Sequence, residues 1–248
     1  MAVLKKAIEA LDPAPDKKKE ITLALNLLFE LAEQKKQLQE EWLKNYLRTA
    51  GTPENPTIPI TNIIAWHNET RAYVKDDASK LVSEIASAVK KFVAGGSDNI
   101  INGISELMSG AITAILGAGT GSVSEMHSYY IMVEGLSIIR IDLTAWQRHI
   151  EAEGITKKIE NAMTFSAVKS SVDVNKITFN TFLQAYNAQL MKMKIPENEV
   201  KKYIIEAKEV FDLLRNNNSH TSFVSNSIEP SSLSVELCMP GHINFLLN

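Results

Sequence analysis

Cysteine is nearly absent from this chain of 248 residues, which contains one thiol, Cys238. A single cysteine excludes an internal disulfide framework and a zinc site built from several thiolates. Positive charge is not in excess either, because 26 Lys and Arg residues face 29 Asp and Glu residues. The net charge of −3 disfavours a dedicated nucleic-acid binder. The hydrophobic fraction of 45% is ordinary for a globular protein and excludes wholesale disorder.

Sequence motifs of catalysis and metal binding are lacking as well. The five histidines form no His-Glu-x-x-His pattern, and neither a phosphate-binding Gly-x-x-x-x-Gly-Lys-Ser/Thr loop nor a Gly-x-Ser-x-Gly elbow occurs. We therefore assign no catalytic residue, no metal ligand and no cofactor, and favour a non-enzymatic role over an enzyme. Charges at Lys5, Lys6 and Glu9 interrupt the stretch where a secretory signal would be apolar. This pattern predicts a protein that is cytoplasmic or exported without a cleaved signal peptide.

Helical periodicity dominates the chain up to about residue 215. It predicts an all-α fold, a compact bundle of about seven or eight helices in a single domain over residues 1–248. The helical body covers 1–215, and the segment 216–248 is predicted to be a short extended, β-hairpin-like element, with an irregular tail as the alternative. The expected helices cover 2–11, 16–50, 61–94, 98–117, 122–153, 157–170, 176–193 and 197–215.

The stretch 16–50 is predicted to form one long amphipathic helix. Its apolar residues fall near one stripe at helical spacing, namely Leu23, Leu27, Leu31, Leu38, Trp42 and Tyr46. Gly51 suits a C-terminal cap. A stripe that extends over about ten turns offers a long surface for contact with another protein.

Glycine is concentrated between residues 95 and 121, where seven of the eleven glycines lie. Gly103, Gly110 and Gly117 are seven residues apart, a spacing that keeps them near one face of a helix. Residues 107–124 contain no charged side chain. The segment 95–139 is therefore predicted to be a central, glycine-rich hydrophobic helical hairpin, whose glycine face packs closely against another helix. On this interpretation, leucine at Gly110 would overpack the contact and destabilise the fold.

This hairpin favours a membrane-interacting protein of the toxin or virulence-factor type. Its plan is similar to that of helical pore-forming proteins, which store a hydrophobic hairpin in a soluble fold, so pore formation is one form that the activity would take. The segment is too interrupted by glycine to be one plain transmembrane helix of about 20 apolar residues. The expected partners are a lipid membrane and further copies of the chain. The membrane-hairpin candidates are Gly103, Leu107, Gly110, Ala114, Leu116, Gly117 and Gly121.

Two single residues are further candidates. His127 lies beside the low-charge segment, and if partly buried it would titrate near neutral pH and act as a switch; an ordinary surface histidine is the alternative. Cys238 is interpreted as a buried structural thiol, with fatty acylation or a nucleophilic role as alternatives.

Two other functions stay open. One is a soluble helical bundle that binds a protein partner or self-assembles through the amphipathic helix 16–50. The other is an enzyme or lipid-binding protein with a pocket inside the bundle, since a pocket assembled from distant helices leaves no local motif.

Overall fold

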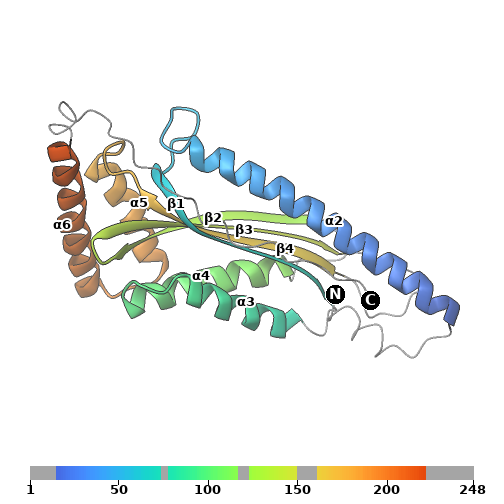
Figure 1. Ribbon diagram of the computed structural model, residues 1–248. Coiled ribbons are helices and arrows are strands. Elements are labelled where there is room, and N and C mark those ends of the chain that lie inside the picture. Colours follow the sequence, from blue (N-terminus) through green and yellow to red (C-terminus); the bar gives the residue numbers. More distant parts are fainter. Residues whose placement is uncertain (1–14, 74–77, 117–122, 150–160, 222–248) are drawn as a thin grey trace, which may run out of the picture.

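The computed structural model describes residues 15–73, 78–116, 123–149 and 161–221. Within them the elements are α2 (Pro15–Arg48), β1 (Ile60–Tyr73), α3 (Ala78–Phe92), α4 (Asp98–Leu116), β2 (Val123–Glu134), β3 (Ser137–His149), β4 (Asn161–Val172), α5 (Phe179–Lys192) and α6 (Glu197–Thr221). The four strands form one antiparallel sheet in the order β1-β4-β3-β2, so β1 and β2 are its edges. Helix α2 runs along one face of the sheet, α3 and α4 run along the other, and α5 and α6 close one end (Figure 1).

The two faces of the sheet differ in chemistry, because successive side chains of a strand point to opposite faces. On the α3–α4 face, Ile139 and Ile141 of β3 join the main hydrophobic core with residues such as Ile104 of α4. On the α2 face, β3 presents Arg140 and Asp142, both buried. Two small apolar clusters hold α2 to this face within the described residues: Leu28 and Ala32 with Trp146 and Ala162, and Leu43 and Leu47 with Val168. Helix α2 therefore covers a largely polar surface.

The predicted all-α bundle is wrong, because the chain forms an α/β fold around the sheet. Helices predicted over 16–50, 98–117, 176–193 and 197–215 are confirmed as α2, α4, α5 and α6. Gly51, with a φ of 86°, has the left-handed conformation expected of a residue just past the end of α2.

The other predicted helices contain the strands. The stretch 61–94 divides into β1 and α3, 122–153 contains β2 and β3, and 157–170 falls largely in β4. The helix predicted for 2–11 lies outside the described residues. The extended element predicted for 216–248 is wrong at its start, because residues 216–221 belong to α6, and the rest of it lies outside the described residues.

The helical hairpin predicted over 95–139 is also wrong, since β2 and the start of β3 make up its second half. These strands are joined by the two-residue turn Gly135-Leu136, with Glu134 paired to Ser137 and Gly135 at a φ of 56°. The prediction that a helical hairpin forms a pore is therefore wrong as well. Within the described residues, no helix has both the length and the hydropathy needed to cross a bilayer.

The glycines of α4 do not share one packed face. Gly103 is buried, and a Cβ added there would lie 2.9 Å from both Cγ and Sδ of Met193. Gly110 is exposed, and a Cβ there would meet no atom within 4 Å. The close contact expected at Gly110 is therefore absent, and Gly117 lies outside the described residues.

We expect Gly110→Ala to raise the free energy of unfolding by up to about 1 kcal/mol, because alanine is the better helix former at an open site. Gly103→Ala should lower it by about 1 kcal/mol or more, since the added methyl group must displace Met193. Urea denaturation of both variants measures the difference. A destabilised Gly110→Ala protein would show that this position is packed after all.

Candidate functional site

A pocket of about 380 Å³ lies between α2 and the strands β2 and β3. Its lining combines apolar, polar and charged side chains from the three elements. They are Lys35, Leu38, Gln39 and Trp42 of α2, Glu125, Met126 and His127 of β2, and Thr144 of β3. Lys35 and Glu125 form an ion pair across the pocket, between the helix and the edge strand.

A buried ion pair lies next to this pocket. Arg140 and Asp142 are two residues apart in β3 and therefore share the α2 face of the sheet, where neither side chain is exposed. Arg140 donates from Nε to Oδ2 of Asp142 over 2.8 Å and from Nη2 to Oδ1 over 2.7 Å. This two-pronged geometry is the strong form of an arginine–carboxylate contact.

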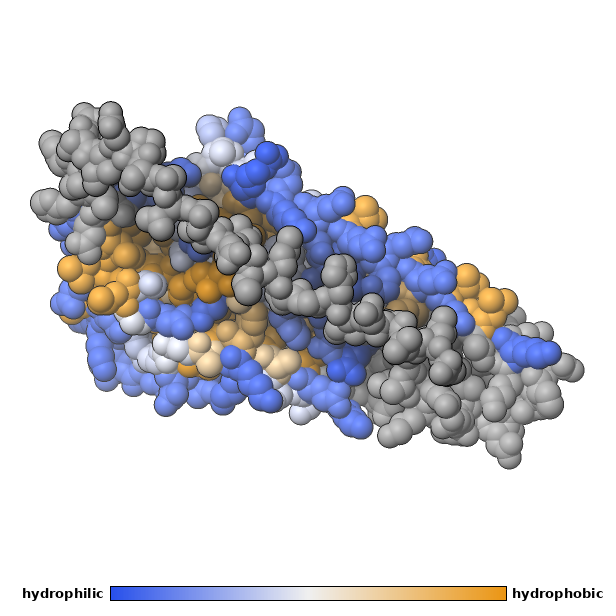
Figure 2. Space-filling view, in the orientation of Figure 1, coloured by the Kyte–Doolittle hydropathy of each residue, from blue (hydrophilic) through white to orange (hydrophobic). Residues whose placement is uncertain are grey.

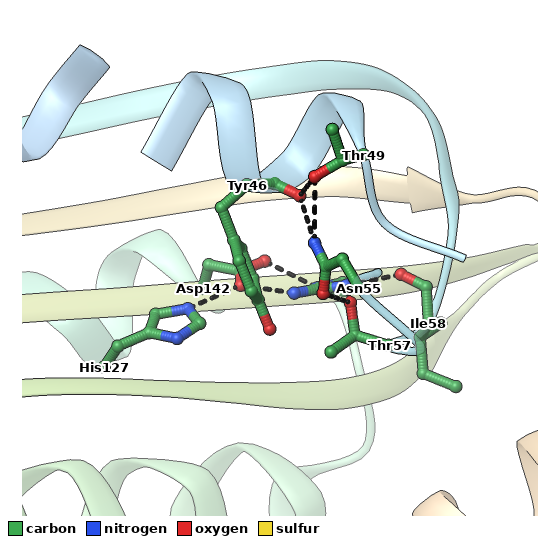
Figure 3. A network of polar contacts seen from close by, with 8 residues as sticks. Tyr46, Thr49, Asn55, Thr57, Ile58, His127 and Asp142 are labelled. Atoms are coloured by element: carbon green, nitrogen blue, oxygen red, sulfur yellow. Dashed lines mark hydrogen bonds and ion pairs between the residues drawn. The ribbon is translucent and has the colours of Figure 1, made fainter. Parts of the chain in front are cut away.

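The loop that follows α2 completes the coordination of Arg140. Its Nη1 donates to the carbonyl of Ile58 and, over 3.3 Å, to Oγ1 of Thr57. Thr57 in turn donates to Oδ1 of Asn55 over 3.0 Å, and Nδ2 of Asn55 donates to the carbonyl of Tyr46 over 2.7 Å (Figure 3). The guanidinium group thus ties the end of α2 and its loop to the centre of the sheet.

Aromatic rings enclose the same guanidinium group. Its central carbon lies 4.4 Å from the ring centroid of Tyr129 and 5.3 Å from that of Tyr46. Tyr46 stacks on Trp42 with the ring centroids 5.1 Å apart. Burial raises the pKa of Tyr129, against the opposing effect of the Arg140 charge, so the phenol stays neutral at physiological pH. A stack therefore runs from a buried cation to Trp42, which is 47% exposed.

His127 lines the pocket and also contacts the buried ion pair. Its Nε2 lies 3.0 Å from Oδ1 of Asp142 (Figure 3), and its ring packs edge-on against Tyr46 and against Trp42. With Nε2 as the donor to the carboxylate, Nδ1 is the acceptor of the neutral ring. The side chain is 20% exposed, so the partial burial on which the predicted pH switch depends is present. The switch itself stays a prediction.

One polar group of the pocket has no partner. Thr144 is 2% exposed, and its buried Oγ1 has no hydrogen-bond partner among the described residues. Gln39, also buried, accepts a 2.6 Å hydrogen bond from Oγ1 of Thr164 through its Oε1, which leaves its amide NH₂ as the group that can still donate. The floor of the pocket therefore retains unused hydrogen-bonding capacity.

The edge of β2 is closed at its far end by a side chain. Gln189 of α5 accepts from the backbone N–H of Ile131 over 2.6 Å and donates to its carbonyl over 2.7 Å. The amide of Gln189 thus imitates a neighbouring strand and blocks pairing with another chain at that point. The pocket lies toward the other end of β2, at Glu125–His127.

The outer surface of α2 carries a second feature, an exposed apolar stripe. Leu23 is 62% exposed, Leu27 58%, Leu38 62% and Trp42 47%. Figure 2 shows hydrophobic side chains standing among hydrophilic ones along this helix. Leu38 and Trp42 also line the pocket, so the stripe reaches its mouth. Leu31 and Tyr46, which share the predicted stripe, are partly buried.

The membrane-hairpin candidates lie away from this site. Gly103, Leu107, Gly110 and Ala114 belong to α4, which packs on the opposite face of the sheet. Gly103 is buried, Leu107 half-buried, and Gly110 and Ala114 are exposed.

The remaining candidates divide between this site and the part of the chain that is not described. The side chain of Leu116 lies outside the described residues, as do Gly117, Gly121 and Cys238. Of the single-residue candidates, His127 is the one in the site. The central pair, Arg140 and Asp142, escaped prediction, although opposite charges two residues apart in an otherwise apolar run are typical of a strand with one polar face.

The chain matches no protein-family model and no curated protein. Among the described residues, no three His, Cys, Asp or Glu side chains gather in a way that could hold a metal ion.

Proposed function

We propose that this protein self-associates through α2, with the α2 helices of two copies packed antiparallel along their exposed stripes. The observation that supports this function is the exposure of Leu23, Leu27, Leu38 and Trp42 on one 34-residue helix. Burying a large apolar side chain stabilises by about 1.5–3 kcal/mol, so a second surface that covers the stripe gains on each contact. Helices pair through apolar residues that line up along one face, as these four do.

The spacing of the stripe fits a second copy of the same helix. Leu23 and Leu27 are four residues apart, and so are Leu38 and Trp42, so the spacing is the same from either end. A two-fold interface requires such self-complementarity, because each contact occurs twice with the partners exchanged. In an antiparallel pair, Leu23 of one copy lies beside Trp42 of the other, and Leu27 lies beside Leu38.

Charges at the middle of the stripe favour the antiparallel direction. Glu30 and Lys35 are equally far from its midpoint, so an antiparallel pair places each Glu30 nearest to Lys35 of the second copy, where it adds to the ion pair that Lys35 makes with Glu125. Glu30 is exposed and Lys35 partly exposed. A parallel pair would instead place like charges together, which suppresses that arrangement.

Sedimentation equilibrium of the full chain tests the proposal. We expect a reversible dimer, and we expect Leu38→Glu to raise its dissociation constant at least tenfold, because two carboxylates would enter an apolar contact (about 1.4 kcal/mol per factor of ten). Leu136→Glu is the matched control, since Leu136 is 72% exposed in the β2–β3 turn, away from α2. It should leave the dissociation constant unchanged.

A wild-type chain that stays monomeric at about 1 mM, where an interaction of about 4 kcal/mol is half formed, would contradict self-association. The proposal would also be contradicted if the chain stays monomeric but binds lipid vesicles, and Leu38→Glu abolishes that binding. The helix α2 would then contact a membrane instead of a second copy. The membrane role predicted for 95–139 stays a separate prediction.

A further inference from the structure

We infer that the pocket between α2, β2 and β3 binds a small, neutral, flat molecule of the phenol class, an aromatic ring with one hydroxyl group. This site goes beyond the proposed self-association. Leu38 and Trp42 belong to both the stripe and the pocket, but the hydroxyl group on which the inference rests, that of Thr144, lies in the sheet. Three features of the lining carry the inference: an unpartnered hydroxyl, an aromatic wall and balanced charge.

The unpartnered hydroxyl belongs to Thr144. A buried hydroxyl without a hydrogen bond destabilises the protein that holds it, and a ligand hydroxyl can supply the missing partner because it both donates and accepts. The amide NH₂ of Gln39 and Nδ1 of His127 add a donor and an acceptor from the same lining. The polar end of a ligand is therefore expected at this floor.

The aromatic wall is provided by Trp42. Tyr46 stacks on this indole, and Trp42 lines the pocket together with Leu38. Offset stacking on an indole is favourable for another aromatic ring. The volume of about 380 Å³ exceeds the roughly 150 Å³ of a cavity that binds benzene, so one ring with a short substituent fits with space left for water.

The charged side chains of the lining are already paired. Lys35 is paired with Glu125, and Nε2 of His127 is hydrogen-bonded to Asp142, which also holds Arg140. A charged ligand would lose its hydration without gaining a free counter-charge. A neutral ligand avoids this loss of hydration free energy.

The test uses p-cresol and toluene, two probes that differ by one hydroxyl group. Saturation-transfer NMR titrations on the full chain should show saturable p-cresol binding, with toluene weaker by about tenfold, the value of one well-made hydrogen bond. Thr144→Val keeps the shape of the side chain and should reduce the affinity for p-cresol to that for toluene. Thr144→Ser, which restores the hydroxyl, should recover most of it.

Ser170→Ala is the matched control. Ser170 is also buried with an unpartnered hydroxyl, but it does not line the pocket, so p-cresol binding should not change. The inference is overturned if wild type shows no saturable p-cresol binding, if Thr144→Val binds it as well as wild type does, or if Ser170→Ala loses as much affinity. Thr144→Val should leave the dimer dissociation constant unchanged, so failure here is distinguishable from failure of self-association.

Discussion

Arg140→Met is expected to lower the free energy of unfolding by about 3–5 kcal/mol, a large part of the stability of a typical domain. The substitution leaves the carboxylate of Asp142 fully buried with the His127 ring as its remaining side-chain partner. It also removes the donor to the carbonyl of Ile58 and the cation between Tyr46 and Tyr129. Breaking one partner of a buried pair costs far more than the pair itself contributes. Urea denaturation followed by circular dichroism measures the change.

Two further variants sharpen this test. The double variant Arg140→Met with Asp142→Leu should recover roughly half of the loss or more, because it leaves no uncompensated charge in the sheet. Arg48→Met is the control, since Arg48 is exposed at the end of α2 and its hydrogen bond to Asn45 is a surface contact. It should change stability by less than about 0.5 kcal/mol. An Arg140→Met protein as stable as the Arg48→Met control would show that the buried pair is not a structural requirement.

The helices of this fold could largely be predicted from the sequence, but its four strands could not, and the inner strand β3 shows the reason. Every residue from Ile138 to Gln147 is buried, because α2 covers one face of β3 and α4 covers the other. A strand that is buried on both faces lacks a clear alternation of exposed and buried positions, and its apolar run cannot be distinguished from that of a buried helix. The turn Gly135-Leu136 was the remaining local feature that indicates a hairpin of two strands.

The long helix shows a different limit of sequence reasoning. The apolar stripe that identifies α2 contains Leu23, Leu27, Leu38 and Trp42, and these are the residues left exposed. The sheet instead receives the neighbouring face, with Ala32, Leu43 and Leu47. Periodicity finds a helix with apolar residues on a wide arc, but tertiary packing decides which part of the arc faces the sheet.

The candidate site could not be predicted from the sequence, because its interacting residues lie far apart along the chain. Arg140 bonds to Ile58, 82 positions earlier in the chain, and Thr164 bonds to Gln39, 125 positions away. Such partners have no sequence spacing to recognise, since the sheet brings them together. His127 could be selected from the sequence alone, because histidine is the residue type whose ordinary pKa lies near neutral pH, whatever its partners are.

Mixing two charge variants of α2 is expected to give a dimer that neither variant forms alone. In the antiparallel arrangement, Leu27 of one copy lies beside Leu38 of the other. Leu27→Lys alone and Leu38→Glu alone each place two unpaired charges in an apolar contact, so each should be largely monomeric. In a one-to-one mixture, the introduced lysine lies beside the introduced glutamate at one contact, while the other contact keeps its two native leucines.

The mixed dimer should therefore be at least about tenfold tighter than either variant with itself, as measured by sedimentation of a mixture in which one chain carries a fluorescent label. Added salt should weaken it, because part of its affinity comes from the attraction between the introduced lysine and glutamate. A mixture of Leu27→Lys with Leu136→Glu is the control: its mixed dimer keeps one unpaired lysine in an apolar contact, so it should be weaker than the dimer that Leu136→Glu forms with itself. Parallel helices would place the two introduced charges at different contacts, each against a leucine. A mixture no tighter than the separate variants would thus exclude the antiparallel pairing, even if the wild-type chain is a dimer.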